Sequence, residues 1–187
     1  YKKQNVLQIL SVGRPHWIKG YDDALKACSI LKQKGIDFHY TIVGASKNNE
    51  EILYLINCLG LESHIQLIDK IAQDEVYHYM NKSNVLIFPS IMEGLPNVVV
   101  EAMALGLPVI STKCGGVIEL IEHEKTGWLV PTRNPDALAN AIQDFAKIPL
   151  TKIEEIRLAA RRKVEAQHSM EQMVLGMESL YLKVIIN

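Results

Sequence analysis

Two glutamates stand where their carboxylates could bind the hydroxyl groups of a ligand. Glu93 lies in a short loop directly before Gly94, whose missing Cβ lets backbone N–H groups approach a ligand closely. Glu101 follows eight residues later in an otherwise apolar segment. A buried carboxylate is costly unless it accepts hydrogen bonds, and the two hydroxyls of a ribose are a natural donor set for it. Taken singly, Glu101 could equally face solvent on a helix, and Glu93 could be a surface-loop acid.

Two cations occupy another loop, with the pattern Gly13-Arg14-x-x-x-x-Lys19-Gly20. Arginine offers a bidentate fork and lysine a point charge, so the loop suits a diphosphate. Each charge-assisted contact of this kind contributes about 1.5–3 kcal/mol. A solvated loop with charges flanking a helix is the alternative. The loop has neither the G-x-G-x-x-G pattern of dehydrogenases nor the G-x-x-x-x-G-K-[ST] pattern of nucleoside triphosphatases, which argues against both classes.

Residues 88–108 form the unit that must position the glutamates. The apolar run before them ends at Pro89, which indicates a strand stopped by a turn. Pro96 can open a helix or Asn97 can cap one, and Gly106 can close it. The N-terminus of that helix would offer unpaired N–H groups and partial positive charge to a phosphate or a sugar hydroxyl.

Strand and helix patterns alternate along the chain. Apolar runs predict strands at 6–12, 38–44, 65–68, 84–88, 108–112 and 128–130, the last at a sheet edge. Helical patterns cover 21–34, 50–59, 73–81, 96–106, 115–122, 134–147, 151–167 and 170–187. Alternation of this kind predicts an α/β fold: a doubly wound, Rossmann-like, mostly parallel six-stranded sheet with helices on both faces and further C-terminal helices.

The unusual loops all follow strands. They cover residues 13–20, 44–48, 69–72, 89–97 and 112–116. Because such sheets bind ligands at the carboxyl ends of their strands, we expect these loops to meet at one rim and form the site there. Gly115-Gly116 with Glu119 could bring a second helix start to this rim, or could form only a tight turn.

Composition excludes several functions. The formal net charge of −1 argues against non-specific nucleic-acid binding. No apolar run approaches the ~20 residues of a membrane span, and the first residues do not form a signal peptide. The three cysteines, Cys28, Cys58 and Cys114, are expected to be reduced, buried thiols of a cytosolic protein. The chain starts almost at its first strand without an initiator Met, so we expect a fragment of a longer protein.

Other chemical side chains have ordinary explanations. The six histidines show no metal-ligand spacing, so we expect no metal site, and no Ser-His-Asp arrangement stands out. We interpret Asp22 and Asp23 as acids of a helix N-terminus. Trp17 and Trp128 are expected to be packing residues.

Against this background, the chain resembles the nucleotide-sugar glycosyltransferases of family 4 over about residues 5–147. Its segment around the two glutamates is similar to the E-x7-E motif of that family. The resembling segments are Pro89-Ser90-x-x-Glu93-Gly94-Leu95-Pro96-x-x-x-x-Glu101-Ala102, Gly106-x-Pro108-Val109-Ile110, Gly115-Gly116-x-x-Glu119, Thr126-Gly127-x-Leu129-Val130-Pro131, and Ser11-Val12-Gly13-Arg14 with Lys19-Gly20.

The resemblance implies the GT-B arrangement, in which two Rossmann-like domains face a cleft. Residues 1–150 would be the donor-binding C-terminal domain and residues 151–187 a helical extension packed on it, while the acceptor-binding N-terminal domain would be absent. The enzyme would be a retaining, nucleotide-sugar-dependent hexosyltransferase that acts on an acceptor such as a growing glycan or a lipid-linked sugar. This chain would bind the donor weakly and transfer nothing alone.

The resemblance also implies roles for the site residues. Gly13, Arg14 and Lys19 would hold the donor diphosphate, Glu101 the ribose hydroxyls, and Glu93 the transferred sugar as the catalytic residue. The remaining donor contacts would be of two kinds. The sugar or phosphate would contact Gly94, Leu95, Pro96 and Asn97, and the base would lie against the loop near Ile71. No metal or other cofactor would be needed, because the Arg/Lys pair and the helix dipole offset the charge growing on the departing nucleotide.

Several alternatives stay open. Departures from the family pattern at Ala45-Ser46, Asp69 and Ile118 leave the donor open among UDP-, GDP- and ADP-sugars. A GT-B-fold sugar-nucleotide epimerase or phosphorylase would share the fold, and a non-catalytic nucleotide-binding domain would share the site. We expect a cytoplasmic location, with peripheral membrane association of a full-length enzyme as a further alternative.

Overall fold

The computed structural model describes residues 6–46 and 48–185. Lys47, in the predicted loop 44–48, and the last two residues of the predicted final helix lie outside this description, as do residues 1–5. Six strands form one sheet in the order β3-β2-β1-β4-β5-β6, and every neighbouring pair is parallel. The strands are β1 (Leu7–Val12), β2 (Phe38–Val43), β3 (Ile65–Ile68), β4 (Val85–Phe88), β5 (Val109–Thr112) and β6 (Trp128–Val130). The predicted Rossmann-like sheet is therefore confirmed, and β6 lies at its edge.

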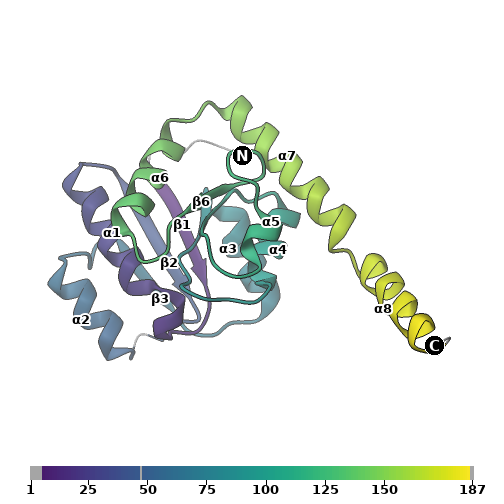
Figure 1. The fold of residues 1–187 in the computed structure, drawn as a ribbon. Coiled ribbons are helices and arrows are strands. Elements are labelled where there is room, and N and C mark those ends of the chain that lie inside the picture. The colour runs from purple at the N-terminus through teal and green to yellow at the C-terminus, as the bar shows by residue number, and fades with distance from the viewer. Residues whose placement is uncertain (1–5, 47, 186–187) are drawn as a thin grey trace.

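Helices connect the strands and cover both faces of the sheet (Figure 1). They are η1 (Trp17–Lys19), a 3-10 turn, and the α-helices α1 (Tyr21–Gln33), α2 (Glu50–Cys58), α3 (Gln73–Lys82), α4 (Asn97–Leu105), α5 (Val117–Leu120), α6 (Pro135–Lys147), α7 (Leu150–Gln167) and α8 (Met170–Ile185). The sequence does not predict η1, and α5 spans half of the short helix expected at 115–122.

Two cores lie on opposite faces of the sheet, because successive strand residues point to opposite sides. In β1, Ile9 joins the core under α1, α2 and α6, while the next residue, Leu10, joins the core under α3, α4 and α5. In β4, Ile87 joins the same core as Ile9, and Leu86 joins the same core as Leu10. Burial on both faces explains why the strands are continuous apolar runs rather than alternating ones.

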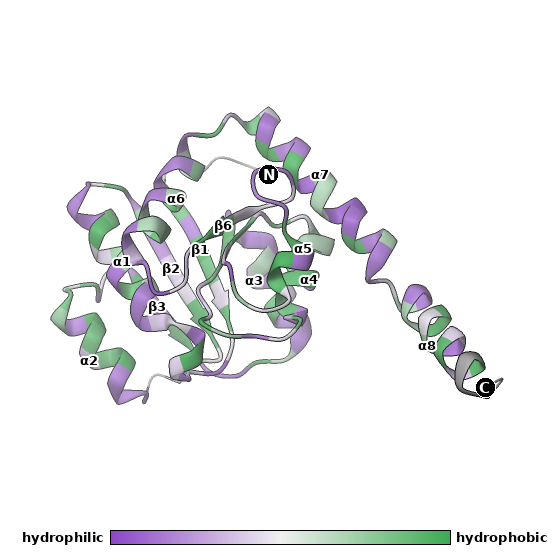
Figure 2. Ribbon diagram, in the orientation of Figure 1, coloured by the Kyte–Doolittle hydropathy of each residue, from purple (hydrophilic) through white to green (hydrophobic). Residues whose placement is uncertain are grey.

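The last two helices differ in their packing. The first half of α7 contributes Ile153 and Ile156 to one core, and its second half contributes Ala160 and Val164 to the other. By contrast, α8 projects away from the sheet (Figure 1), and every residue from 170 to 182 is exposed. Apolar residues nevertheless run along α8 (Figure 2). Among the described residues, no helix combines the length and apolar character that a membrane span requires.

Candidate functional site

The candidate site lies at the carboxyl ends of the two central strands. The chain leaves β1 towards one side of the sheet and β4 towards the other, so the strand order reverses between them. In doubly wound sheets this reversal opens a crevice that binds ligands. The loops after β1 and β4 carry Arg14, Lys19 and Glu93, and the sequence predicted all three for the site.

Glycines let these loops touch through their backbones. Gly20 has a φ of 65°, and a Cβ there would lie 2.2 Å from the carbonyl oxygen of Pro89. The N–H of Ile91 donates to the carbonyl of Ile18 at 2.7 Å, which ties the loop after β4 to the loop after β1. The two loops are therefore held in register by main-chain contacts, before any side chain is considered.

Gly115 and Gly116 bring the start of α5 to the same rim. Gly115 has a φ of 46°, and a Cβ there would lie only 1.6 Å from the carbonyl oxygen of Glu93. The N–H of Gly116 donates to the carbonyl of Gly94 at 3.0 Å. Of the two alternatives for this glycine pair, the helix start at the rim is confirmed, and the approach of the two backbones requires glycine.

Lys19 and Glu93 form an ion pair across the crevice. The distance from Nζ to Oε2 is 2.5 Å, and each side chain is about one quarter exposed. Nζ also lies 5.5 Å from the centre of the Phe88 ring, so the cation is held partly by an aromatic face. A ligand phosphate near Lys19 would thus be next to the carboxylate of Glu93.

The loop after Glu93 leads directly into α4. Gly94 and Leu95 are exposed, and a Cβ on Gly94 would meet nothing within 4 Å. Pro96 is the N-cap and Asn97 the first helical residue, and no side chain caps this end. The alternative that Asn97 caps the helix is therefore wrong, because it lies one residue inside. The N–H groups of Val99 and Val100 donate to the carbonyl of Pro96, so those of Asn97 and Val98 are the ones left available to a ligand.

Glu101 lies one turn into α4 and is half-buried. Its Oε1 accepts a hydrogen bond from Nε2 of Gln73 at 2.7 Å, and the same amide donates to the hydroxyl of Tyr77 at 2.8 Å. Burial raises the pKa of the Glu101 carboxyl, and the hydrogen bond from Gln73 opposes that rise. The prediction that Glu101 is not an ordinary solvent-facing residue agrees with this arrangement.

Gln73 was not predicted as a site residue. It is the first residue of α3 and lies two residues after Ile71, which is half-buried against the core below α4. The contact with Glu101 therefore brings the Ile71 loop beside α4. A polar residue at a helix start looks ordinary in a sequence, and the 28 residues that separate Gln73 from Glu101 hide the contact.

The first loop, residues 13–20 after β1, begins with Gly13 and Arg14. Gly13 donates its N–H to the carbonyl of Val43 and accepts a hydrogen bond from the hydroxyl of Tyr21, both at 2.8 Å. Arg14 is exposed and makes no hydrogen bond or ion pair with any described residue. The structure therefore joins Lys19 to Glu93 and Glu101 to α3, and gives the Arg14 guanidinium no polar partner among the described residues.

Of the predictions about the cysteines and tryptophans, some are confirmed and others are wrong. Cys28 and Cys114 are buried as expected, but Cys58 is exposed at the end of α2. Trp128 packs edge-on against Phe145 with ring centres 5.3 Å apart, whereas the packing role expected of Trp17 is wrong because it is 62% exposed. In the described part of the chain, no three His, Cys, Asp or Glu side chains are grouped so that they could hold a metal ion.

Comparison with known proteins places this geometry in a family. The family model for glycosyl transferases group 1 matches residues 1–163. The amylovoran biosynthesis glycosyltransferase AmsK of Erwinia amylovora is 38% identical over 167 residues, which are 86% of this chain and 41% of AmsK. The putative colanic acid biosynthesis glycosyltransferase WcaL of Escherichia coli K12 is 35% identical over 178 residues, 92% of this chain and 43% of WcaL.

A solved structure agrees with the sequence relatives. A glycosyltransferase from Rickettsia africae superposes with a TM-score of 0.89 at 28% identity, over 98% of this chain and 49% of that protein. The chain spans about two fifths of the length of the curated relatives it matches. Sequence, fold and family model agree, and the chain belongs to the group 1 family of glycosyltransferases.

Proposed function

We propose that this chain is the donor-binding half of a retaining glycosyltransferase that moves a hexose from a nucleotide diphosphate sugar to a growing glycan or a lipid-linked sugar. Family membership and relatives named for amylovoran and colanic acid biosynthesis support a role in making a polysaccharide. The observation that carries the proposal is the Lys19–Glu93 pair at the crevice between β1 and β4, beside the uncapped start of α4.

In this proposal the donor lies along the rim from α3 to η1. Glu101, positioned by Gln73, accepts hydrogen bonds from the ribose hydroxyls, and the Ile71 loop lies against the base. Arg14, Lys19 and the backbone at Gly13 hold the diphosphate. Glu93 is the catalytic residue that binds the transferred sugar, with help from the backbone of residues 94–97. The Lys19 contact holds the Glu93 carboxylate at the point where phosphate and sugar meet.

The chemistry follows from these roles. When the bond between sugar and phosphate breaks, negative charge grows on the departing nucleotide. Arg14, Lys19 and the N–H groups at the start of α4 stabilise that charge, which is the part of catalysis that preorganised donors serve best. We therefore propose that the reaction needs no metal ion and no further cofactor.

In our proposal, the acceptor binds to a part of the protein that lies outside this chain. Residues 1–150 form the donor domain and residues 151–187 a helical extension, while a second domain supplies the acceptor site. The relatives are more than twice as long as the matched segment, which supports this division. We expect the 187-residue chain to bind nucleotide but not to transfer sugar, and the whole protein to work in the cytoplasm or at the inner membrane surface.

A binding panel tests the proposal. UDP, GDP, ADP and their sugars are titrated calorimetrically into the chain and into Arg14→Ala and Glu101→Ala. We expect one nucleotide to bind best and both variants to weaken it by about 10-fold or more, since each loses a charge-assisted contact. Arg162→Ala, an exposed cation on α7, is the control and should bind like the unaltered chain. Absence of binding by every nucleotide, or binding by both variants as tight as that of the unaltered chain, contradicts the proposal.

A further inference from the structure

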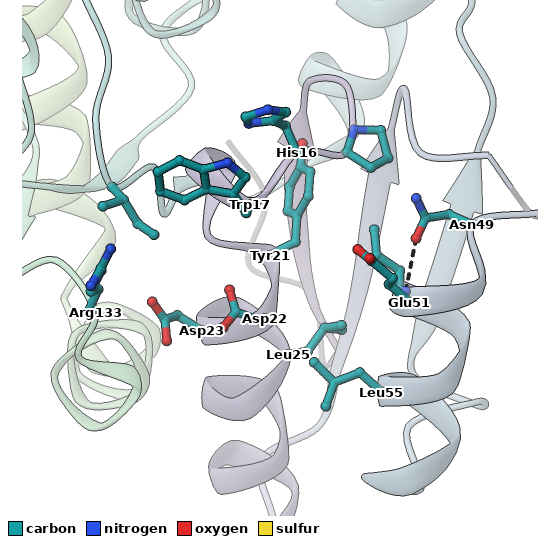
Figure 3. Close-up of a pocket in the computed structure, with 13 residues that line it drawn as sticks. His16, Trp17, Tyr21, Asp22, Asp23, Leu25, Asn49, Glu51, Leu55 and Arg133 are labelled. Carbon is teal, nitrogen blue, oxygen red and sulfur yellow. Dashed lines mark hydrogen bonds between the residues drawn. The ribbon is translucent and has the colours of Figure 1, made fainter.

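A cavity of about 460 Å³ lies on the other side of the first loop, between the N-terminal ends of α1 and α2 (Figure 3). Its floor is apolar and includes Leu25, Ile52 and Leu55. Its rim is polar and carries Asp22, Asp23 and Glu51. The volume falls in the ~300–1,000 Å³ range of small-molecule sites, and an apolar floor with a few polar groups is their usual composition.

Trp17 forms one wall of this cavity. It is the first residue of η1 and is 62% exposed, although an indole is among the side chains that gain most from burial. The His16 side chain accepts a hydrogen bond from the N–H of Ile18 and fixes the start of the turn. Lys19, at the other end of the same turn, holds Glu93. The exposed indole of Trp17 and the donor-site cation of Lys19 therefore stand on the same short turn.

Asp23 is a buried carboxylate without a hydrogen-bond donor. Its side chain lines the cavity and is only 9% exposed, yet it accepts no hydrogen bond from any described residue. Burial raises the pKa of Asp23, and the charges of Lys26 and Arg133 oppose that rise. The carboxylate oxygens of Asp23 are not closed off from solvent, so water or a ligand in the cavity can donate hydrogen bonds to them.

The charges narrow the class of ligand. Three carboxylates at the rim disfavour a phosphate or another anion. Lys26 lies 3.3 Å from Asp22, and Arg133 lies beside Asp23 (Figure 3), so two of the three negative charges are offset. That arrangement lacks the strong field that would select a polycation. An uncharged ligand with several hydroxyl donors and an apolar face matches the cavity best.

We propose that this cavity binds a neutral sugar unit of the glycan acceptor other than the reacting unit held by the second domain, with one face of the ring against Trp17 and hydroxyls donating to Asp23 and Glu51. Calling this sugar an acceptor rests on the proposed function. The donor and acceptor sugars then occupy opposite sides of the loop that carries Trp17 and Lys19.

Nuclear magnetic resonance of the 187-residue chain tests the proposal, because its two indole N–H groups report separately. Trp17 lines the cavity, and Trp128 is buried against Phe145 in the core. Maltotetraose, cellotetraose and galactotetraose are titrated, with spermidine as a cationic probe. We expect at least one oligosaccharide to shift the Trp17 signal and leave the Trp128 signal in place. No shift with any of the three, or a shift with spermidine alone, overturns the proposal.

Variants with matched controls complete the test. Asp23→Ala, read at the Trp17 signal, and Trp17→Ala, read by calorimetry, should each weaken the oligosaccharide by about 10-fold or more. Tyr54→Ala removes an equally exposed aromatic of α2 outside the cavity, and Glu50→Gln alters the acid beside Glu51; both should bind normally. Trp17→Ala removes an exposed side chain and should leave the fold intact. Normal binding by both cavity variants overturns the proposal.

The same samples separate this inference from the proposed function. Nucleotide binding is measured on Glu101→Ala and Asp23→Ala. If nucleotide binds and depends on Glu101 while no oligosaccharide binds, only the cavity assignment fails. If an oligosaccharide binds through Asp23 while no nucleotide binds, the cavity is a sugar site and the proposed donor function fails.

Discussion

The two sides of the first loop offer opposite designs for binding. On the α3–α4 side two pairs of polar side chains are already formed, Lys19 with Glu93 and Gln73 with Glu101. On the α1–α2 side Trp17 is exposed and Asp23 is buried without a donor. Groups that are paired in advance are held in place and lose little entropy when a ligand arrives. Unpaired groups around a cavity depend on the ligand for their contacts. We therefore expect the α3–α4 side to hold its ligand in a fixed position, and the α1–α2 side to select which ligand binds.

Main-chain contacts maintain the paired side, so the largest effect should come from Gly115→Ala. Its Cβ would collide with the backbone of Glu93, and the positive φ adds strain. We expect a loss of about 2–4 kcal/mol, or roughly 5–15 °C in the melting temperature, and loss of nucleotide binding. Gly94→Ala is the control in the contacting loop, since its Cβ would meet open space and its melting temperature should be near normal. Equal melting temperatures for the two variants would contradict the close backbone approach.

Removing the cation of the paired side should affect binding far more than stability. Lys19→Ala should weaken nucleoside diphosphate by roughly 10–100-fold, because a charge-assisted phosphate contact is lost. The free energy of unfolding should change by less than about 1 kcal/mol, since both members of the pair contact solvent. Lys26→Ala, which removes a comparable cation from the cavity side, should leave nucleotide affinity unchanged. If Lys26→Ala weakens the nucleotide as strongly, the two sides are not separate sites.

A smaller effect should follow from Gln73→Ala, which leaves Glu101 in place without its hydrogen bond. We expect nucleotide affinity to fall by about 2–10-fold, as for one net hydrogen bond. The 2′-deoxy nucleotide separates positioning of Glu101 from general damage to the fold. It lacks a hydroxyl that would donate to Glu101, so its affinity should fall less in Gln73→Ala. The exposed neighbour Asp74→Ala is the control, read by the same calorimetric titrations. An equal loss for both nucleotides would show that Gln73 acts only on the fold.

The smallest effect concerns Glu101 and pH. Because burial raises its pKa, the folded protein holds the Glu101 proton more tightly than the unfolded chain. Ionisation therefore costs stability as pH rises through the raised pKa. Glu101→Gln should be slightly more stable than the unaltered chain at pH 7, by less than about 1 kcal/mol, and the advantage should vanish near pH 4. Urea unfolding at both pH values, with exposed Glu62→Gln as control, checks the sign; greater stability of the unaltered chain at pH 7 would refute it.

The fold was predictable because each strand is a short apolar run and each helix ends at a recognisable residue. Gly106 takes a φ of 72° and closes α4, as expected. The α3–α4 side of the site was predictable for a similar reason: Glu93, Glu101 and Lys19 are charges in places where local structure does not need them. The boundaries of η1 and α5 escaped prediction because both are shorter than two turns and depend on contacts between loops.

The cavity side was not predictable from local patterns. Its lining residues come from the first loop, α1, α2, the loop after β4 and the loop after β6. Asp22 and Asp23 are first-turn acids of α1, as interpreted, and this ordinary explanation conceals the buried carboxylate. Trp17 was expected to pack because tryptophan usually does. Gln73 was missed on the other side for the same reason, since its partner lies in another element.

Affinity for the best-binding nucleoside diphosphate, measured on Glu101→Ala and Trp17→Ala, tests the central claim most directly. The claim is that the donor binds on the α3–α4 side of the first loop and not in the cavity. We predict that Glu101→Ala weakens the nucleotide by about 10-fold or more and that Trp17→Ala leaves its affinity within about twofold of normal. Normal binding by Glu101→Ala together with weakened binding by Trp17→Ala would place the nucleotide in the cavity and contradict the account.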